Sequence, residues 1–199
     1  MNEVADTSGA GHSYTSSEDS DGLSPTTFGT VVHRINELRP PKDEWPAIIR
    51  RLSRMAGEEP TETDIDDAVD HAADAVEFVD QIEAEAQLQA VYDEYSVVVR
   101  IGESRIVGDI DRLLVTPDAY HIIDYKTNDL SSTTSEELAE HYRPQMLAYA
   151  LALLQHDRSR DVRASLRFTD AGVEEGFSWQ SEQIVDIESE LRSMMELVG

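Results

Sequence analysis

The chain has 199 residues, of which 41 are acidic and 16 are basic, so its formal net charge at pH 7 is −25. This charge excludes an ordinary basic nucleic-acid binder. The absence of cysteine excludes disulfides, thiolate zinc sites, iron–sulfur clusters and a cysteine nucleophile. With 40% hydrophobic residues the chain can build one core, and no apolar run reaches the roughly 18 residues that cross a membrane. We therefore expect one soluble, cytoplasmic domain that does not contact a membrane.

The basic residues are 14 arginines and only two lysines, Lys42 and Lys126. Together with the many carboxylates, this bias suggests a halophilic protein, with a composition like that of haloarchaeal proteins. In concentrated salt the Debye length falls to about 3 Å, which weakens the repulsion between like charges. The alternative is an acidic surface in ordinary cytosol, and composition leaves both interpretations open.

The composition changes near residue 23. Residues 1–23 are mostly Ser, Thr, Gly and Asp and have almost nothing to bury, so we expect a disordered tail or linker. A single domain should cover residues 24–199. We expect its first part, residues 24–92, to be helical, and residues 93–199 to form an α/β core.

Three helices are predicted in the first part. Ser24 and Pro25 supply the N-cap and the first helical position of one helix, which Pro40 and Pro41 end. Apolar residues at helical spacing predict two more helices, over residues 45–55 and from residue 64 to about residue 92.

The apolar period then changes to that of strands. Three β-rich segments separated by short turns predict an antiparallel meander: residues 95–101, 105–115 and 120–127. The remaining predicted elements are a helix from residue 133 or 134 to about 155, strands over 162–168 and 173–179, and a helix over 181–197. This order predicts an α/β (α+β) fold with a helical N-terminal part.

Two neighbouring predicted strands carry Asp111, Asp124 and Lys126. Because residues two apart share a face of a strand, Asp124 and Lys126 should point the same way. Asp111 can lie beside Asp124, which would place two carboxylates and an ammonium in one pocket. Carboxylates are typical ligands of Mg²⁺, and such an ion can activate water and stabilise charge on a scissile phosphate. The lysine is notable in a chain that almost always uses arginine, because its pKa is easily tuned.

Each candidate also has a structural interpretation. Asp109 shares a strand face with Asp111, and either could be a solvated surface charge. His33, on an otherwise apolar helix, could be an ordinary boundary histidine. Tyr142 and Tyr149 could simply pack.

Four sequence blocks occur in this order: Phe28-Gly-Thr-Val-Val-His33, Gly108-Asp-Ile-Asp111-Arg112, Ile123-Asp124-Tyr125-Lys126-Thr127, and Tyr142-Arg-Pro-Gln145-Met-Leu-Ala-Tyr149. They resemble the RecB/AddA-type nuclease domain of the PD-(D/E)XK superfamily, as found at the C-terminus of UvrD-like (UvrD/Rep) DNA helicases. The resemblance covers about residues 25–170.

The resemblance implies roles for particular residues. The implied catalytic residues are Asp111, Asp124 and Lys126. The implied metal ligands are His33, Asp111, Asp124 and the backbone carbonyl of Tyr125. The implied DNA-binding or supporting residues are Gln145, Tyr149, Tyr142 and Arg112. Glu94 matches a less regular glutamate of the family.

The resemblance also implies a fold and an activity. The fold is restriction-endonuclease-like, with a central mixed sheet, a three-strand antiparallel meander and flanking helices. The activity is that of a Mg²⁺- or Mn²⁺-dependent deoxyribonuclease, similar to the nuclease domain of exodeoxyribonuclease V, which acts as an exonuclease in DNA repair and recombination. The partners would be DNA, as single strands or duplex ends, and a UvrD/AddA-type helicase in cis or in trans.

Two departures from the family limit this reading. The pattern Gly-x-x-x-x-Gly-Lys-[Ser/Thr] is missing, so the chain has no ATP site of that kind. It is either a fragment or a stand-alone nuclease that works with a separate helicase. The charge of −25 also opposes DNA binding, because phosphate contacts need local Lys or Arg. The alternative function is a catalytically silent, nuclease-like module that binds DNA or docks to a helicase.

Overall fold

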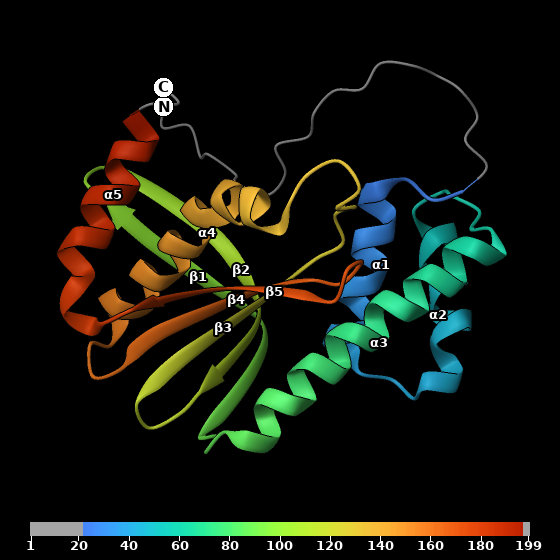
Figure 1. Cartoon of the computed structure of the whole chain (residues 1–199), viewed down its shortest axis with the longest axis horizontal. Coiled ribbons are helices and arrows are strands. Elements are labelled where there is room, and N and C mark those ends of the chain that lie inside the picture. The colour runs from blue at the N-terminus through green and yellow to red at the C-terminus, as the bar shows by residue number, and fades with distance from the viewer. Residues whose placement is uncertain (1–21, 197–199) are drawn as a thin grey trace.

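The computed structural model describes residues 22–196. They form one five-stranded mixed sheet with flanking helices, which confirms the predicted α/β class (Figure 1). The tail predicted for residues 1–23 lies almost entirely outside the described residues.

The elements follow one another in this order: α1 (Pro25–Leu38), η1 (Lys42–Glu44), α2 (Trp45–Met55), α3 (Glu62–Glu85), β1 (Ala90–Ile101), β2 (Ser104–Val115), β3 (Ala119–Lys126), α4 (Ser135–His156), β4 (Asp161–Phe168), β5 (Val173–Trp179), η2 (Ser181–Gln183) and α5 (Ile184–Glu196). Capping side chains set the helix starts. The Ser24 side chain accepts a hydrogen bond from the backbone of Thr27 at the start of α1. Capping boxes begin α3 at Thr61 and α4 at Thr134.

The strands are arranged in sequence order, β1-β2-β3-β4-β5. The first three form the predicted antiparallel meander. β4 lies parallel to β3, and β5 returns antiparallel to β4. A parallel neighbour requires a long crossover, which α4 provides. The sheet is therefore mixed, as predicted.

The main core lies between the sheet and α4, with α5 packed beside α4 (Figure 1). Leu147, Leu151 and Leu154 of α4 are fully buried and face the apolar side of the strands. On the other face of the sheet, α3 covers Leu114, Ile123 and Tyr125. Among the helices within residues 22–196, none is both long and apolar enough to cross a membrane.

Helices α1, α2 and α3 form a smaller cluster at one end of the sheet (Figure 1). Val32, Ile35, Trp45 and Ile49 are buried there. The Trp45 indole nitrogen donates a hydrogen bond to the carbonyl of Pro40, so its polar group is also satisfied. This cluster holds α1 beside the end of β3.

The prediction of one helix from residue 64 to about residue 92 is wrong at its C-terminal end. The helix ends at Glu85, Ala86 is extended, and the first strand begins at Ala90 instead of residue 95. Residues 90–92 pair with residues 113–115 of β2. Pairing with a strand that is distant in sequence therefore overrides the local helical pattern. The expected boundary between residues 92 and 93 falls inside β1.

The last predicted helix, over residues 181–197, is divided. A short 3-10 helix occupies Ser181–Gln183, and α5 continues as Ile184–Glu196. Residue 197 lies outside the described residues.

We expect Leu147→Ala to destabilise the fold by about 2–5 kcal/mol, because it opens a cavity where α4 packs on the sheet. Val185→Ala is the control, since Val185 is 73% exposed and its truncation should change stability by no more than about 0.5 kcal/mol. Urea unfolding of both variants at one fixed KCl concentration measures the difference. Equal stability of the two variants would contradict the packing of Leu147 between α4 and the sheet.

Candidate active site

The candidate site lies where β2 and β3 separate. Their ladder runs from the pair Val115–Tyr120 to the pair Arg112–Ile123 and ends there. β3 continues alongside β4 as far as Lys126. The sheet therefore forks, and the backbone of β3 beyond Ile123 has no partner in β2.

The Asp111 side chain fills the opening of the fork. Its Oδ2 accepts a hydrogen bond of 2.8 Å from the backbone N–H of Tyr125, which the β2 ladder leaves unpaired. The other oxygen, Oδ1, lies 3.3 Å from Nδ1 of His33. Asp111 thus joins two strands and a helix at one point.

His33 reaches the fork from α1. Its Nε2 lies 3.0 Å from the backbone carbonyl of Tyr125. Gly29, one turn earlier, allows this approach, because an added Cβ there would lie 3.2 Å from Oγ1 of Thr127. The imidazole is 32% exposed, so it borders both the protein interior and solvent.

Glu94 joins His33 and Asp111 in a group whose ligand atoms all lie within 4.8 Å of one another. Glu94 and Asp111 stand opposite each other where the β1–β2 ladder skips both, between the pairs Asp93–Arg112 and Tyr95–Ile110. Glu94 adopts a φ of 49°, which is uncommon for a residue other than glycine. This break in the ladder belongs to the candidate site.

Asp124 and Lys126 form a buried ion pair next to this group. Asp124 Oδ2 lies 2.6 Å from Lys126 Nζ, and the two side chains are 2% and 14% exposed. They share a face of β3, as the two-residue spacing requires. Within residues 22–196, Asp124 Oδ2 has no directional hydrogen bond, so the contact with the ammonium is electrostatic.

Helix α4 supports Lys126 through a hydrogen bond. Gln145 Oε1 accepts a hydrogen bond of 3.2 Å from Lys126 Nζ, and the Gln145 amide donates one of 2.8 Å to the Tyr149 hydroxyl. Tyr149 in turn donates to the backbone carbonyl of Asp109. A Cβ on Gly108 would lie 2.8 Å from the Tyr149 ring, so only glycine lets α4 approach β2 this closely.

Tyr142 lies one turn before Gln145. Its ring centroid is 4.1 Å from Lys126 Nζ, a distance at which a cation is attracted to the face of the ring. Its hydroxyl donates a hydrogen bond of 3.0 Å to Asn128. Lys126 is therefore surrounded by a carboxylate, an amide and an aromatic ring.

The charged groups determine one another's pKa. Burial lowers the pKa of His33, but the Asp111 carboxylate outweighs burial and raises it to about 9. Burial raises the pKa of Asp111, but His33 beside it outweighs burial and holds the pKa below its usual value. Burial dominates at Asp124 and raises its pKa, although Lys126 opposes this. Burial lowers the pKa of Lys126, but the two carboxylates raise it above the ordinary value.

These residues fit a divalent cation chemically. One imidazole nitrogen, two carboxylates and the carbonyl oxygen of Tyr125 converge from four different elements, α1, β1, β2 and β3. Oxygen ligands suit Mg²⁺ and Mn²⁺, and imidazole suits transition metals. Asp124 Oδ2, buried and without a directional hydrogen bond within residues 22–196, is a further oxygen next to this group.

Two sequence candidates lie elsewhere. Arg112 is 6% exposed and forms ion pairs with Glu83 and Asp93 on the α3 side of the sheet. Its guanidinium is occupied there and does not face the fork. The carboxylate of Asp109 accepts a hydrogen bond from Ser96 on the neighbouring strand, so only its backbone carbonyl contacts the Tyr149 side of the site.

Sequence reasoning missed the support behind Lys126. The Lys126 carbonyl accepts hydrogen bonds from the backbone N–H and the hydroxyl of Thr169, at 2.9 and 3.2 Å. The same hydroxyl lies 2.7 Å from Nδ1 of His71 on α3. His71 had no motif around it in the sequence, and only the tertiary contact, across 98 residues, connects it to the site.

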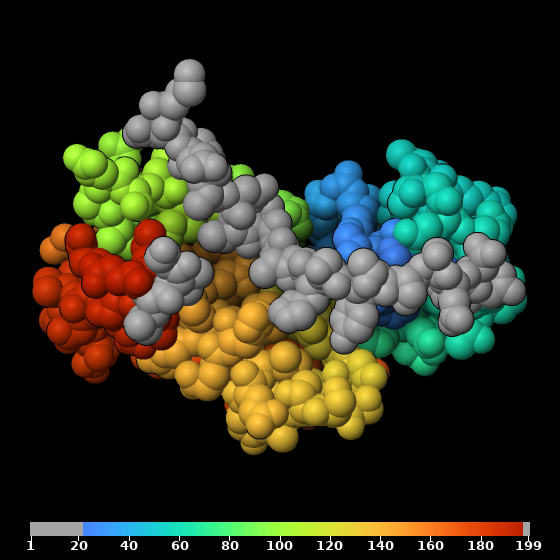
Figure 2. Space-filling view, turned by 90° about the horizontal axis from the view of Figure 1, so that it is seen from above, coloured from blue at the N-terminus to red at the C-terminus, as the bar shows by residue number. Residues whose placement is uncertain are grey.

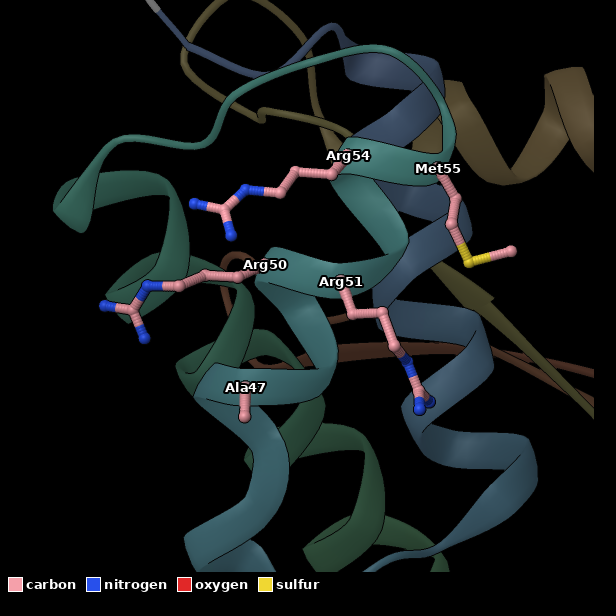
Figure 3. Close-up of a pocket in the computed structure, with 5 residues that line it drawn as sticks. All are labelled: Ala47, Arg50, Arg51, Arg54 and Met55. Atoms are coloured by element: carbon pink, nitrogen blue, oxygen red, sulfur yellow. The ribbon is translucent and has the colours of Figure 1, made fainter.

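An open hollow of about 540 Å³ on α2 is separate from the fork (Figure 3). Arg50, Arg51, Arg54 and Met55 line it, and Arg50 and Arg54 point away from Arg51. Glu62 and Glu59 form ion pairs with Arg50 and Arg54. Because carboxylates already neutralise two of its three arginines, this hollow is not a second candidate for the site.

Comparison with solved structures finds low similarity. The alignment with a proposed exonuclease from Eubacterium rectale covers 92% of this chain and 68% of that protein, with 11% identity and a TM-score of 0.45. Protein VC1899 from Vibrio cholerae covers 88% of this chain, with 15% identity and a TM-score of 0.35, and this chain spans about half (52%) of its length.

Comparison with protein families gives a clear result. No relative is found among curated proteins. The family described as the PD-(D/E)XK nuclease superfamily matches residues 10–198, which is nearly the whole chain. The chain therefore belongs to the PD-(D/E)XK nuclease superfamily.

Proposed function

We propose that this chain is a divalent-metal-dependent DNA nuclease that hydrolyses phosphodiester bonds as an exonuclease. The observation that carries the proposal is the convergence of His33, Glu94 and Asp111 beside the buried Asp124–Lys126 pair. Membership of a nuclease superfamily supports it. The β1–β2 ladder skips Glu94 and Asp111, and Glu94 has a positive φ, which is a backbone conformation that costs free energy and is common at functional sites.

We propose Mg²⁺ or Mn²⁺ as the cation, held by His33, Asp111 and the carbonyl of Tyr125. Asp124 is the ligand implied by the family resemblance, and Glu94 is the ligand favoured by its position in the group within 4.8 Å. When bound, the cation would act as a Lewis acid on the scissile phosphate and lower the pKa of a water molecule.

The remaining chemistry belongs to side chains of this protein. Lys126 Nζ, a donor of three hydrogen bonds, orients the attacking water and stabilises the charge on a phosphate oxygen. Asp124 holds the ammonium in place, and Gln145 fixes it from the other side. Tyr142 favours the charged form of Lys126 through its ring.

The cellular setting is a further part of the proposal. We place the nuclease in the end processing of DNA repair and recombination, in the cytoplasm, as the RecB/AddA-like nuclease part or partner of a UvrD/AddA-type helicase. We also propose a halophilic environment, because the chain has 41 acidic residues and only 16 basic ones. The four sequence blocks that resemble the RecB/AddA family support the repair setting and the helicase, and the composition supports the halophilic environment.

Asp111→Asn and Lys126→Gln should each lower the DNA cleavage rate by at least about 10³-fold, since each removes a charge that acts in the transition state. Cleavage of a labelled DNA in Mn²⁺ or Mg²⁺ at high KCl measures this. Lys42→Gln is the control, because Lys42 is the other lysine of the chain and is exposed. Thermal unfolding of each variant separates loss of chemistry from loss of fold, which matters because Lys126 is a buried partner of Asp124.

Wild-type cleavage rates in either site variant would contradict the proposed mechanism. A wild-type protein that cleaves no DNA in the presence of either metal would favour the silent, nuclease-like module.

Glu94→Gln should weaken the binding of Mn²⁺ by about tenfold or more, because it removes a carboxylate from the group around His33. Isothermal titration calorimetry at high KCl measures this affinity. Glu37→Gln is the matched control, since Glu37 is a neighbouring carboxylate that pairs with Arg34 outside the group. Equal affinity of the two variants would show that Glu94 is not a ligand, and no binding by the wild type would again favour the silent module.

The melting temperature should rise when KCl is increased from about 0.1 M to molar concentration, because screening weakens the repulsion among the excess carboxylates. Differential scanning calorimetry in both buffers measures the change. Sodium sulfate is not a suitable substitute, because it strengthens apolar burial in any protein. A melting temperature that is unchanged or lower in molar KCl would contradict the halophilic proposal.

A further inference from the structure

The β1–β2 hairpin has one exposed face that begins at the candidate site. Alternate residues of β1 from Val97 to Ile101 are buried against α4, and the residues between them are exposed. From the fork to the turn, the exposed face carries three cross-strand pairs: Ser96 with Asp109, Val98 with Val107, and Arg100 with Arg105. It begins beside Glu94 and Asp111, which the ladder skips. The same face therefore has carboxylates at one end and guanidinium groups at the other.

Arg100 and Arg105 are unusual for this protein. Ten of its 14 arginines lie within 4.0 Å of a carboxylate oxygen: Arg34, Arg39, Arg50, Arg54, Arg112, Arg143, Arg160, Arg163, Arg167 and Arg192. Within residues 22–196, neither Arg100 nor Arg105 has such a partner. They are also direct cross-strand neighbours, an arrangement that destabilises a sheet when both charges are alike. The pair is thus open to an external anion.

The spacing suits a polymer. Asp111 lies six positions after Arg105 on β2, and Glu94 lies six positions before Arg100 on β1. At about 3.3 Å per residue the arginines lie about 20 Å along the strands from the carboxylates. If the strand keeps the stacked spacing of about 3.4 Å per phosphate that it has in a duplex, this length corresponds to about six nucleotides, and an extended strand would span it with fewer. A mononucleotide at the fork would not reach the arginines.

The middle of the face is mainly apolar. Val98 and Val107 are 41% and 36% exposed, and they offer contact to sugars or bases. Asp109 places a negative charge on the exposed face of the hairpin, and its carboxylate accepts a hydrogen bond from Ser96. Its carboxylate disfavours a phosphate there and favours phosphate contacts at the arginine end.

The hairpin also lies in a suitable place. In Figure 2 the hairpin (green) lies on the same side of the view as α5 (red), and α1 and α2 (blue to teal) lie on the opposite side. His33 on α1 and the carboxylates of the hairpin meet between these two sides. A strand that lies along the hairpin would therefore lead into the fork.

We propose that the exposed face of the β1–β2 hairpin guides one DNA strand into the fork, with Arg100 and Arg105 binding phosphates several nucleotides from the scissile one. This inference rests on the proposed nuclease function and names where its substrate lies. Contacts to phosphates carry no sequence information, so the guidance is independent of sequence. It also gives this acidic protein a local cationic site for DNA.

The test compares the wild type with the double variant Arg100→Gln/Arg105→Gln. Fluorescence anisotropy of a single-stranded oligonucleotide of random sequence, in EDTA, gives the Kd without cleavage. We expect the Kd to rise by fivefold or more. The slope of log K against log[KCl] should become shallower by about 1.4, since each lost phosphate contact contributes about 0.7 for a single strand.

Cleavage adds a second measurement. In Mn²⁺, the KM for the long strand should rise in the double variant more than kcat falls. A dinucleotide, which ends before the arginines, should be cleaved by both proteins with the same kcat/KM. An equal loss on both substrates would overturn the inference, because it would indicate damage at the fork.

The control is Arg51→Gln/Arg158→Gln, which removes the same charge from two exposed arginines elsewhere. It should leave Kd and salt slope unchanged. If this control and the hairpin variant lose affinity equally, net charge explains the effect and the inference fails. The inference also fails if the hairpin variant binds DNA with the affinity of the wild type. That result is expected if the arginines bind an acidic protein instead of DNA. A wild type that binds but never cleaves would refute the proposed function alone, because the binding comparison still decides the role of the arginines.

Discussion

The hydrogen bond from the Tyr125 N–H to Asp111 is the interaction on which the site depends. A buried backbone N–H that loses its strand partner must find another acceptor. Here the acceptor is a side chain, so β2 and β3 can separate without an unsatisfied group. The separation frees the Tyr125 carbonyl for His33 and leaves room for charged groups between the strands. The fork and its chemistry are therefore one structural feature.

The second constraint is the cost of charge in this interior. Asp124 is 2% exposed, and burial alone would favour its neutral form. Lys126 compensates by direct contact, and Gln145 and Tyr142 restrict the lysine. Removing one partner of such a pair is expensive, because the other remains buried and charged. The Asp124–Lys126 pair therefore needs both of its partners in place.

Local patterns in the sequence account for much of this structure. Residues two apart on a strand share a face, which was enough to place Asp124 beside Lys126. Residues four apart on a helix share a face, which places Gln145 beside Tyr149. The meander and α4 likewise follow from apolar periodicity and short turns. These features depend on geometry that a few neighbouring residues determine, so the sequence alone determined them.

Tertiary structure decided the features that join distant segments. Whether residues 90–92 become helix or strand depends on their pairing with β2, and the local pattern favoured the wrong answer. Glu94 meets His33 and Asp111 only because the ladder skips it, which no spacing reveals. Arg112 follows a motif aspartate, and its neutralisation by Glu83 depends on how α3 packs against the sheet. The physical reason is common to all three: a side chain's partner is set by strand register and helix packing, which arise only when the whole chain has folded.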